Sequence, residues 1–193
     1  RADTPDLYRY KYQKLLSMRG MGEGTGARGK IGIPLGLNMY ENLPFWFAFF
    51  TRLNFEVVLS PESSRQLYIL GQQTIPSDTV CYPAKLLHGH VEALAAQQAV
   101  AIFYPCMPYN FDEGAGDNHY NCPVVAYYPE LLAANMPVLK TVRFLNPYFG
   151  LHRPKDFERR AAAYFLEQFG VPASETAGAA RAAYEAYDAY KRD

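Results

Sequence analysis

Apolar residues in this chain fall into short runs, each bounded by residues that favour turns. Five runs have the length of buried strands. They span residues 30–34, 55–59, 100–104, 124–127 and 141–145. Residues 74–80 form either a short connection or a further strand. Because a strand, a helix and a second strand with short connections make a right-handed unit with parallel strands, the pattern predicts an α/β fold. We expect an open, doubly wound, mostly parallel sheet of the Rossmann-like type.

Prolines, glycines and capping residues indicate where the helices between these runs begin and end. Pro44 fits the first turn of a helix. The run after it, FWFAFFTRL, is apolar nearly all round, which indicates a deeply buried helix. Ser63 can cap the next helix. We expect helices near residues 44–53, 63–70, 83–97, 129–135, 154–169 and 173–193.

The chain divides into three predicted regions. Residues 1–29 are a polar lead-in and a glycine-rich linker, residues 30–170 are the Rossmann-like domain, and residues 171–193 are a C-terminal helix. The glycine run GMGEGTGARG is superficially similar to a dinucleotide-binding loop. That loop follows a strand, whereas this run precedes the first predicted strand. We therefore interpret it as a linker, and the chain as a piece of a longer protein.

Composition narrows the function classes. Apolar residues make up 49% of the chain, so a buried core is expected. Lys and Arg number 19, as do Asp and Glu, so no basic footprint for nucleic acid is present. No apolar run reaches the roughly 18 residues that a membrane span needs, and we expect a cytoplasmic location. Three cysteines are an odd number, which argues against a disulfide framework.

All three cysteines stand at predicted boundaries between structural elements. Cys81 opens a helix, Cys106 follows a strand, and Cys122 precedes a predicted strand. Because ligands bind at the carboxyl edge of an open α/β sheet, the thiols can meet there as one three-cysteine metal site. No C-x-x-C pair is present, so zinc-ribbon and bacterial ferredoxin spacings are absent. The alternative is that the cysteines are buried and structural. The position of Cys81 favours the metal site, since a helix N-terminus stabilises a thiolate.

Other polar residues near the cysteines have simpler interpretations. His88 and His90 are two apart on a predicted helix, so they do not share a face. His90 lies on the apolar stripe, which indicates a core histidine. His119 either donates a hydrogen bond to a bound cluster or holds its own loop together. Lys85 is better explained as a solvated helix lysine. No nucleophile pattern is legible, so the catalytic residues stay unknown.

Several long segments resemble the uncharacterised domain of CoA-substrate-specific enzyme activases. They include IGIPLGLNMYENLPFWFAFF, TIPSDTVCYPAKLLHGHVEAL, IFYPCMPYN and DNHYNCPVVAYYPELL. The resemblance covers roughly residues 30–155. In these large proteins an ATPase activator module is joined to modules similar to the 2-hydroxyacyl-CoA dehydratase and benzoyl-CoA reductase subunits.

The resemblance implies an iron–sulfur function. In the dehydratase subunits, three cysteines of a Rossmann-like domain hold a 4Fe–4S cluster with one open iron position. By this resemblance Cys81, Cys106 and Cys122 are the metal ligands, and His119 joins them as a cofactor-binding residue. The cofactor is then a 4Fe–4S cluster or half of a double cubane, as in the related double-cubane cluster proteins. We expect it to be lost in aerobic preparation.

The sequence therefore predicts an iron–sulfur-cluster-binding domain for ATP-dependent low-potential electron transfer, or for activation of a 2-hydroxyacyl-CoA dehydratase-like system. The expected partners are neighbouring ATPase activator and dehydratase-like modules of the parent protein, and a homodimer is left open. The chain contains no P-loop motif, so ATP hydrolysis is not expected in it, and whether it is an enzyme stays open. The alternative is a non-catalytic structural or docking module with buried cysteines.

Overall fold

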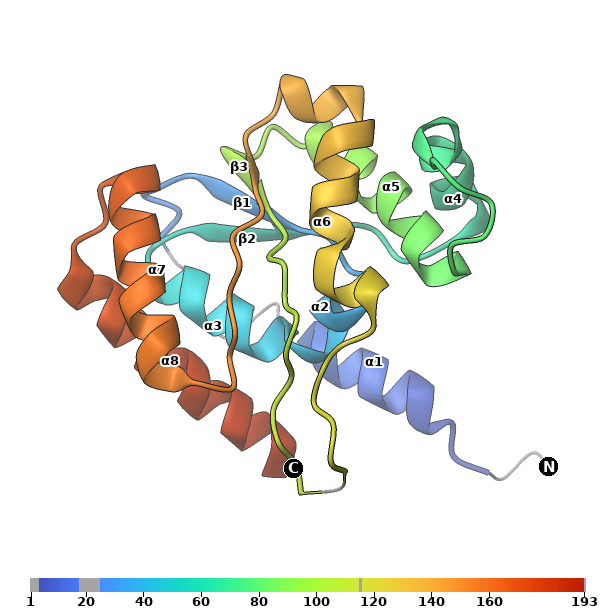
Figure 1. Ribbon diagram of the computed structural model, residues 1–193. Coiled ribbons are helices and arrows are strands. Elements are labelled where there is room, and N and C mark those ends of the chain that lie inside the picture. Colours follow the sequence, from blue (N-terminus) through green and yellow to red (C-terminus); the bar gives the residue numbers. More distant parts are fainter. Residues whose placement is uncertain (1–3, 18–24, 115, 193) are drawn as a thin grey trace.

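An open sheet of four parallel strands forms the centre of the molecule (Figure 1). The computed structural model describes residues 4–17, 25–114 and 116–192. The strands are β1 (Lys30–Ile33), β2 (Glu56–Leu59), β3 (Ala101–Phe103) and β4 (Phe144–Leu145), in the order β2-β1-β3-β4. Ile31 of β1 stands opposite Val57 of β2 and Ala101 of β3. The predicted α/β class with a parallel sheet is confirmed.

The helices follow the strands in alternation. They are α1 (Leu7–Ser17), α2 (Asn38–Glu41), α3 (Leu43–Arg52), α4 (Arg65–Gly71), α5 (Tyr82–Ala95), α6 (Pro123–Asn135), α7 (Pro154–Phe169) and α8 (Ala173–Arg192), with short 3₁₀ turns η2 (Gln72–Thr74) and η3 (Pro137–Lys140). Helices α3, α7 and α8 lie on one side of the sheet, and α4, α5 and α6 lie on the other (Figure 1). No helix of the described residues is both long and apolar enough to cross a membrane.

The core on the α3 side is aromatic. The sequence of α3 is apolar on nearly every face, and Phe45, Trp46, Phe49 and Phe50 are fully buried. The ring of Trp46 meets that of Phe103 on β3 edge-on, with centroids 4.7 Å apart. Such edge-on pairs add to the stability that burial of the rings provides. This core packs against β3 and so fixes the position of the segment after it, which carries Cys106.

Residues 124–127 form no strand, so this prediction is wrong. They belong to α6, which runs from Pro123 to Asn135 and contains the shorter helix predicted over residues 129–135. Cys122 caps it, since its Sγ accepts a hydrogen bond from the N–H of Val125, and Pro123 occupies the first turn. A short apolar run fits a buried strand and a helix equally well. Here the Cys122 cap and Pro123 start a helix at this run. Residues 75–80 form no strand either, so the described residues make four strands rather than five.

The start of α4 differs by one residue from the expectation. Ser64 is the cap, because its Oγ accepts from the N–H of Leu67, whereas Ser63 Oγ lies 3.0 Å from Nε2 of His90. The other predicted helices are present with small changes at their ends. The predicted glycine-rich linker falls partly on residues 18–24, which lie outside the described residues.

Candidate functional site

Cys106 lies at the carboxyl edge of the sheet. Its N–H donates to the carbonyl of Pro147 at 2.9 Å, and its carbonyl accepts from the N–H of Phe149 at 3.1 Å. These bonds continue the parallel pairing of β3 and β4 beyond both strands. The Cys106 side chain is buried, as expected for a segment anchored between β4 and α6. The sequence prediction that it follows a strand is confirmed.

Cys81 and Cys122 stand at the N-termini of two helices. Cys81 is the cap residue of α5 and Cys122 that of α6, and both are exposed. A proline lies in the first turn of each helix. The Sγ of Cys122 accepts from the N–H of Val125 at 3.5 Å. N–H groups at a helix start favour the thiolate over the thiol. Two of the three cysteines therefore stand at helix N-termini, where backbone N–H groups point toward their side chains.

Tyr104 connects the three cysteines. Its side chain is fully buried, and its hydroxyl has no hydrogen-bond partner among the described residues. Burial raises the pKa of this hydroxyl well above its ordinary value, and negative charge on Cys106, Tyr128, Cys122 and Cys81 adds to the rise. The hydroxyl thus lies within electrostatic reach of all three thiols. Sequence reasoning missed Tyr104, and its position two residues before Cys106 was the available signal.

The thiol of Cys106 is held in its protonated form. Burial, and after it the charge of Glu130, raise its pKa to about 11. The backbone N–H of Glu130 and the hydroxyl of Tyr148 act in the opposite direction. At neutral pH this thiol therefore keeps its proton unless a bound metal replaces that proton.

His88 and Tyr128 form a buried link next to Cys81. The Thr74 hydroxyl donates to the carbonyl of Gly71, so Nδ1 of His88, at 2.7 Å, must donate to Thr74 Oγ1. This assigns Nε2 of His88 as the acceptor from the Tyr128 hydroxyl, 3.0 Å away. Burial lowers the pKa of His88 to about 4, in keeping with a neutral ring. Burial and the charge of Cys81 raise the pKa of Tyr128 to about 12.

His90 is a satisfied core histidine, as its place on the apolar stripe indicated. Its Nδ1 lies 2.7 Å from Ser60 Oγ, and its Nε2 lies 3.0 Å from Ser63 Oγ. Burial lowers its pKa to about 4. With both nitrogens occupied by protein hydroxyls, His90 has no lone pair left for a metal.

His119 and Lys85 make local contacts. Nε2 of His119 lies 3.6 Å from a carboxylate oxygen of Asp112, and its ring tilts against Tyr109. These contacts tie the loop after Cys106 together, while a role of His119 toward a cofactor stays a prediction. Nζ of Lys85 donates to the carbonyl of Asp78 at 2.8 Å, which steadies the turn before Cys81.

The described residues contain no group of three His, Cys, Asp or Glu side chains arranged to hold a metal ion. A single ion requires all its donors within about 2.0–2.3 Å of one point. In a four-iron cluster each cysteine binds a different iron, so the sulfurs stand further apart. The three thiols of the described residues are thus not arranged as ligands of one ion.

The chain is an α/β domain with a parallel sheet, and Cys106 lies at the carboxyl edge of that sheet. Residues 30–193 match the family model described as CoA enzyme activase uncharacterised domain (DUF2229). The chain belongs to this family, which confirms the resemblance seen in its motifs and extends it through α8. No curated protein and no solved structure matches the chain.

Proposed function

We propose that this CoA enzyme activase domain binds an iron–sulfur cluster through Cys81, Cys106 and Cys122. The cluster would serve ATP-dependent low-potential electron transfer, or activation of a 2-hydroxyacyl-CoA dehydratase-like system. The observation that supports the proposal is the buried Tyr104 hydroxyl, two residues before Cys106, which lacks a partner among the described residues. A buried hydroxyl without a partner is costly. A bound group that accepts its hydrogen bond removes this cost.

The residues present fit such a group. Cys81 and Cys122 lie at helix N-termini, where N–H groups favour thiolates and can hydrogen-bond to sulfur. Cys106 must lose its proton, and the nearby N–H of Glu130 and hydroxyl of Tyr148 favour its ionised form. A bound iron–sulfur cluster would supply one-electron chemistry at low potential. The protein's own residues would orient the thiolates, and Tyr104 and Tyr128 would shield the buried side of the site from water.

A second candidate function is a non-catalytic docking module, and the surface of α1 favours it. Leu7, Tyr8 and Tyr10 on this helix are 72%, 90% and 60% exposed. Tyrosine is enriched at protein interfaces. In this alternative the neighbouring activator and dehydratase-like modules bind the surface, and the raised pKa of Cys106 belongs to an inert buried thiol.

Anaerobic reconstitution with iron and sulfide tests the proposal. The wild-type chain is expected to take up iron and acid-labile sulfide with thiolate-to-iron absorption, and chain purified in air is expected to contain no intact cluster. The matched control is the variant with all three cysteines changed to serine, which measures iron that adheres without thiols. Circular dichroism checks that both chains are folded. Equal iron content in the two chains would contradict the proposed cluster, and the docking module would then be the remaining candidate function.

A further inference from the structure

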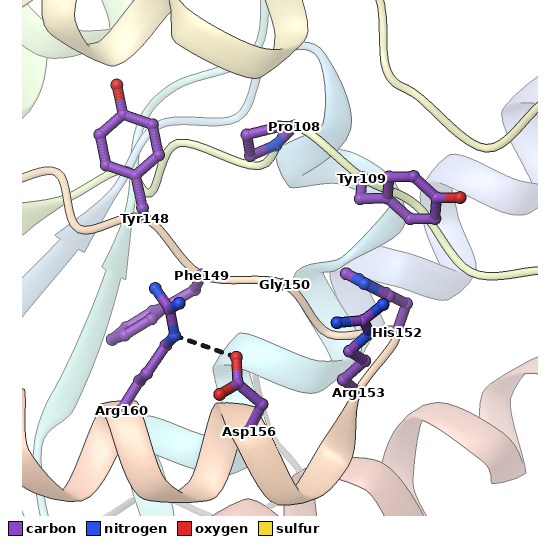
Figure 2. Close-up of a pocket in the computed structure, with 9 residues that line it drawn as sticks. All are labelled: Pro108, Tyr109, Tyr148, Phe149, Gly150, His152, Arg153, Asp156 and Arg160. Carbon is purple, nitrogen blue, oxygen red and sulfur yellow. Dashed lines mark ion pairs between the residues drawn. The ribbon is translucent and has the colours of Figure 1, made fainter.

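A cavity of about 260 Å³ lies between Pro108 and Tyr109, on the segment that follows Cys106, and the start of α7 (Figure 2). It is lined by Pro108, Tyr109, Tyr148, Phe149, Gly150, His152, Arg153, Asp156 and Arg160. Figure 2 shows Arg153, Asp156 and Arg160 at the start of α7 on one side of this space, and Pro108, Tyr109 and Tyr148 on the other, with the rings of the two tyrosines pointing outward. A space of this size suits a small molecule.

The charges around the cavity are unbalanced. The carboxylate of Asp156 is shared by two guanidinium groups, since Nε of Arg160 lies 2.9 Å and a terminal nitrogen of Arg159 lies 2.6 Å from its oxygens. The carbonyl of Arg153 accepts from the N–H of Phe157, but its guanidinium has no hydrogen bond or ion pair among the described residues. The lining therefore has an excess of positive charge, and the N-terminal end of the α7 dipole adds to it.

His152 presents a polar atom that its surroundings leave unused. Its Nδ1 is buried without a hydrogen-bond partner among the described residues. The ring packs so closely on Gly150 that a Cβ there would come within 2.8 Å of it. It also tilts against Tyr109, with centroids 4.6 Å apart. Burial and the charge of Arg153 lower the pKa of His152. The neutral ring donates a hydrogen bond through Nδ1 in the tautomer that carries its proton there.

We infer that this cavity binds a small organic anion, with a carboxylate or phosphate group between Arg153 and Arg160 and an apolar body against Pro108, Tyr109 and Phe149. Guanidinium groups bind both kinds of oxyanion through paired hydrogen bonds. Tyr148 is one of the lining residues, and its side chain also interacts with Cys106, so the anion site adjoins the segment that carries this cysteine. Anion binding itself is independent of a cluster. Only its role as a substrate position rests on the proposed function.

Calorimetric titration with four probes tests the site: inorganic phosphate, phenyl phosphate, acetate and benzoate. We expect the ring-bearing anion of each pair to bind about fivefold or more tightly than its ringless counterpart, because the apolar walls then contribute. The head group is identified as the one, phosphate or carboxylate, whose probes bind with the higher affinity. Arg153→Ala is expected to weaken that binding about tenfold or more. The matched control, Arg65→Ala at the exposed start of α4, removes the same charge away from the cavity and should leave binding unchanged.

A second variant keeps every charge. Gly150→Ala adds a methyl group against the His152 ring, so the ring has to move, and the affinity should fall. Absence of binding by all four probes, or equal losses in Arg153→Ala and Arg65→Ala, would overturn the site. The triple cysteine-to-serine chain separates the two proposals: it should still bind the anion. A failed cluster reconstitution with intact anion binding contradicts the proposed function alone, whereas a normal cluster without anion binding contradicts this inference alone.

Discussion

The hydroxyl of Tyr148 donates a hydrogen bond to the carboxylate of Glu130. This bond joins the segment after β4 to the second half of α6, directly beside the Cys106 thiol. The negative charge of this carboxylate raises the pKa of Cys106, while the contacts of the thiol with Tyr148 and with the Glu130 backbone lower it. A change of the exposed residue Glu130 on α6 should therefore change the pKa of the buried Cys106 thiol.

Glu130→Gln is expected to lower the pKa of the Cys106 thiol from about 11. The pKa should stay above the ordinary value for cysteine, about 8.5, because burial is the larger cause and is unchanged. Thiolate absorbance near 240 nm, followed against pH in a chain with Cys81 and Cys122 changed to serine, measures this. Glu62→Gln, which neutralises an exposed carboxylate in the segment before α4, is the control. A pKa in Glu130→Gln equal to that of the control would contradict the coupling.

The sequence predicted the sheet and most helices because their patterns are local. Proline and glycine marked the ends of α3 and α7, and the apolar stripe placed His90 in the core. The run VVAYY failed because its period fits a strand and a helix alike. Its helical state depends on the Cys122 cap, and a cysteine is not among the residues that usually signal one.

Parts of the site depend on tertiary contacts and were hidden from sequence reasoning. The missing partner of Tyr104 follows from the packing of α5 and α6 around β3, which no local pattern encodes. Part of the cavity lining could have been predicted from the sequence. Arg153 and Arg160 are two helical turns apart and so share a face of α7. The aromatic wall opposite them comes from the segment after Cys106, which only the β3–β4 pairing brings near.

Stability should fall as the pH is lowered from about 6.5 to about 4, because of His88 and His90. Both have a folded-state pKa near 4, below the ordinary value of 6.5, so the unfolded chain takes up more protons in this window. Their stabilisation is present above 6.5 and is lost as the pH falls through the window, with a limiting slope of about 1.4 kcal/mol per pH unit for each ring. Urea unfolding at several pH values measures it. His90→Gln should reduce the slope, and an unchanged slope would contradict the assignment.

Gly89→Ala should destabilise the fold by about 3 kcal/mol or more, because α4 and α5 touch backbone to backbone there. A Cβ on Gly89 would come within 1.8 Å of the carbonyl oxygen of Leu67, and one on Gly71 within 2.2 Å of the Gly89 nitrogen. Gly178→Ala in α8 is the matched control, since its Cβ meets nothing within 4 Å. There the better helix propensity of alanine should add about 1 kcal/mol. Thermal or urea unfolding of both variants gives the comparison, and equal stabilities would refute the close approach.

Tyr104→Phe should have different effects on the metal-free chain and on the chain reconstituted with iron and sulfide. In the metal-free chain the hydroxyl has no partner among the described residues, so its removal should leave stability unchanged or raise it by up to about 1 kcal/mol. If the chain binds the proposed cluster, the same change would remove a hydrogen bond to it, so iron should be released faster and the reduction potential should fall. Unfolding of the metal-free chain and iron release under a chelator are the two measurements. Tyr40→Phe, a change of the same atom near α1, is the control. If Tyr104→Phe destabilises the metal-free chain and leaves iron release unchanged, the hydroxyl serves the fold rather than a bound cluster.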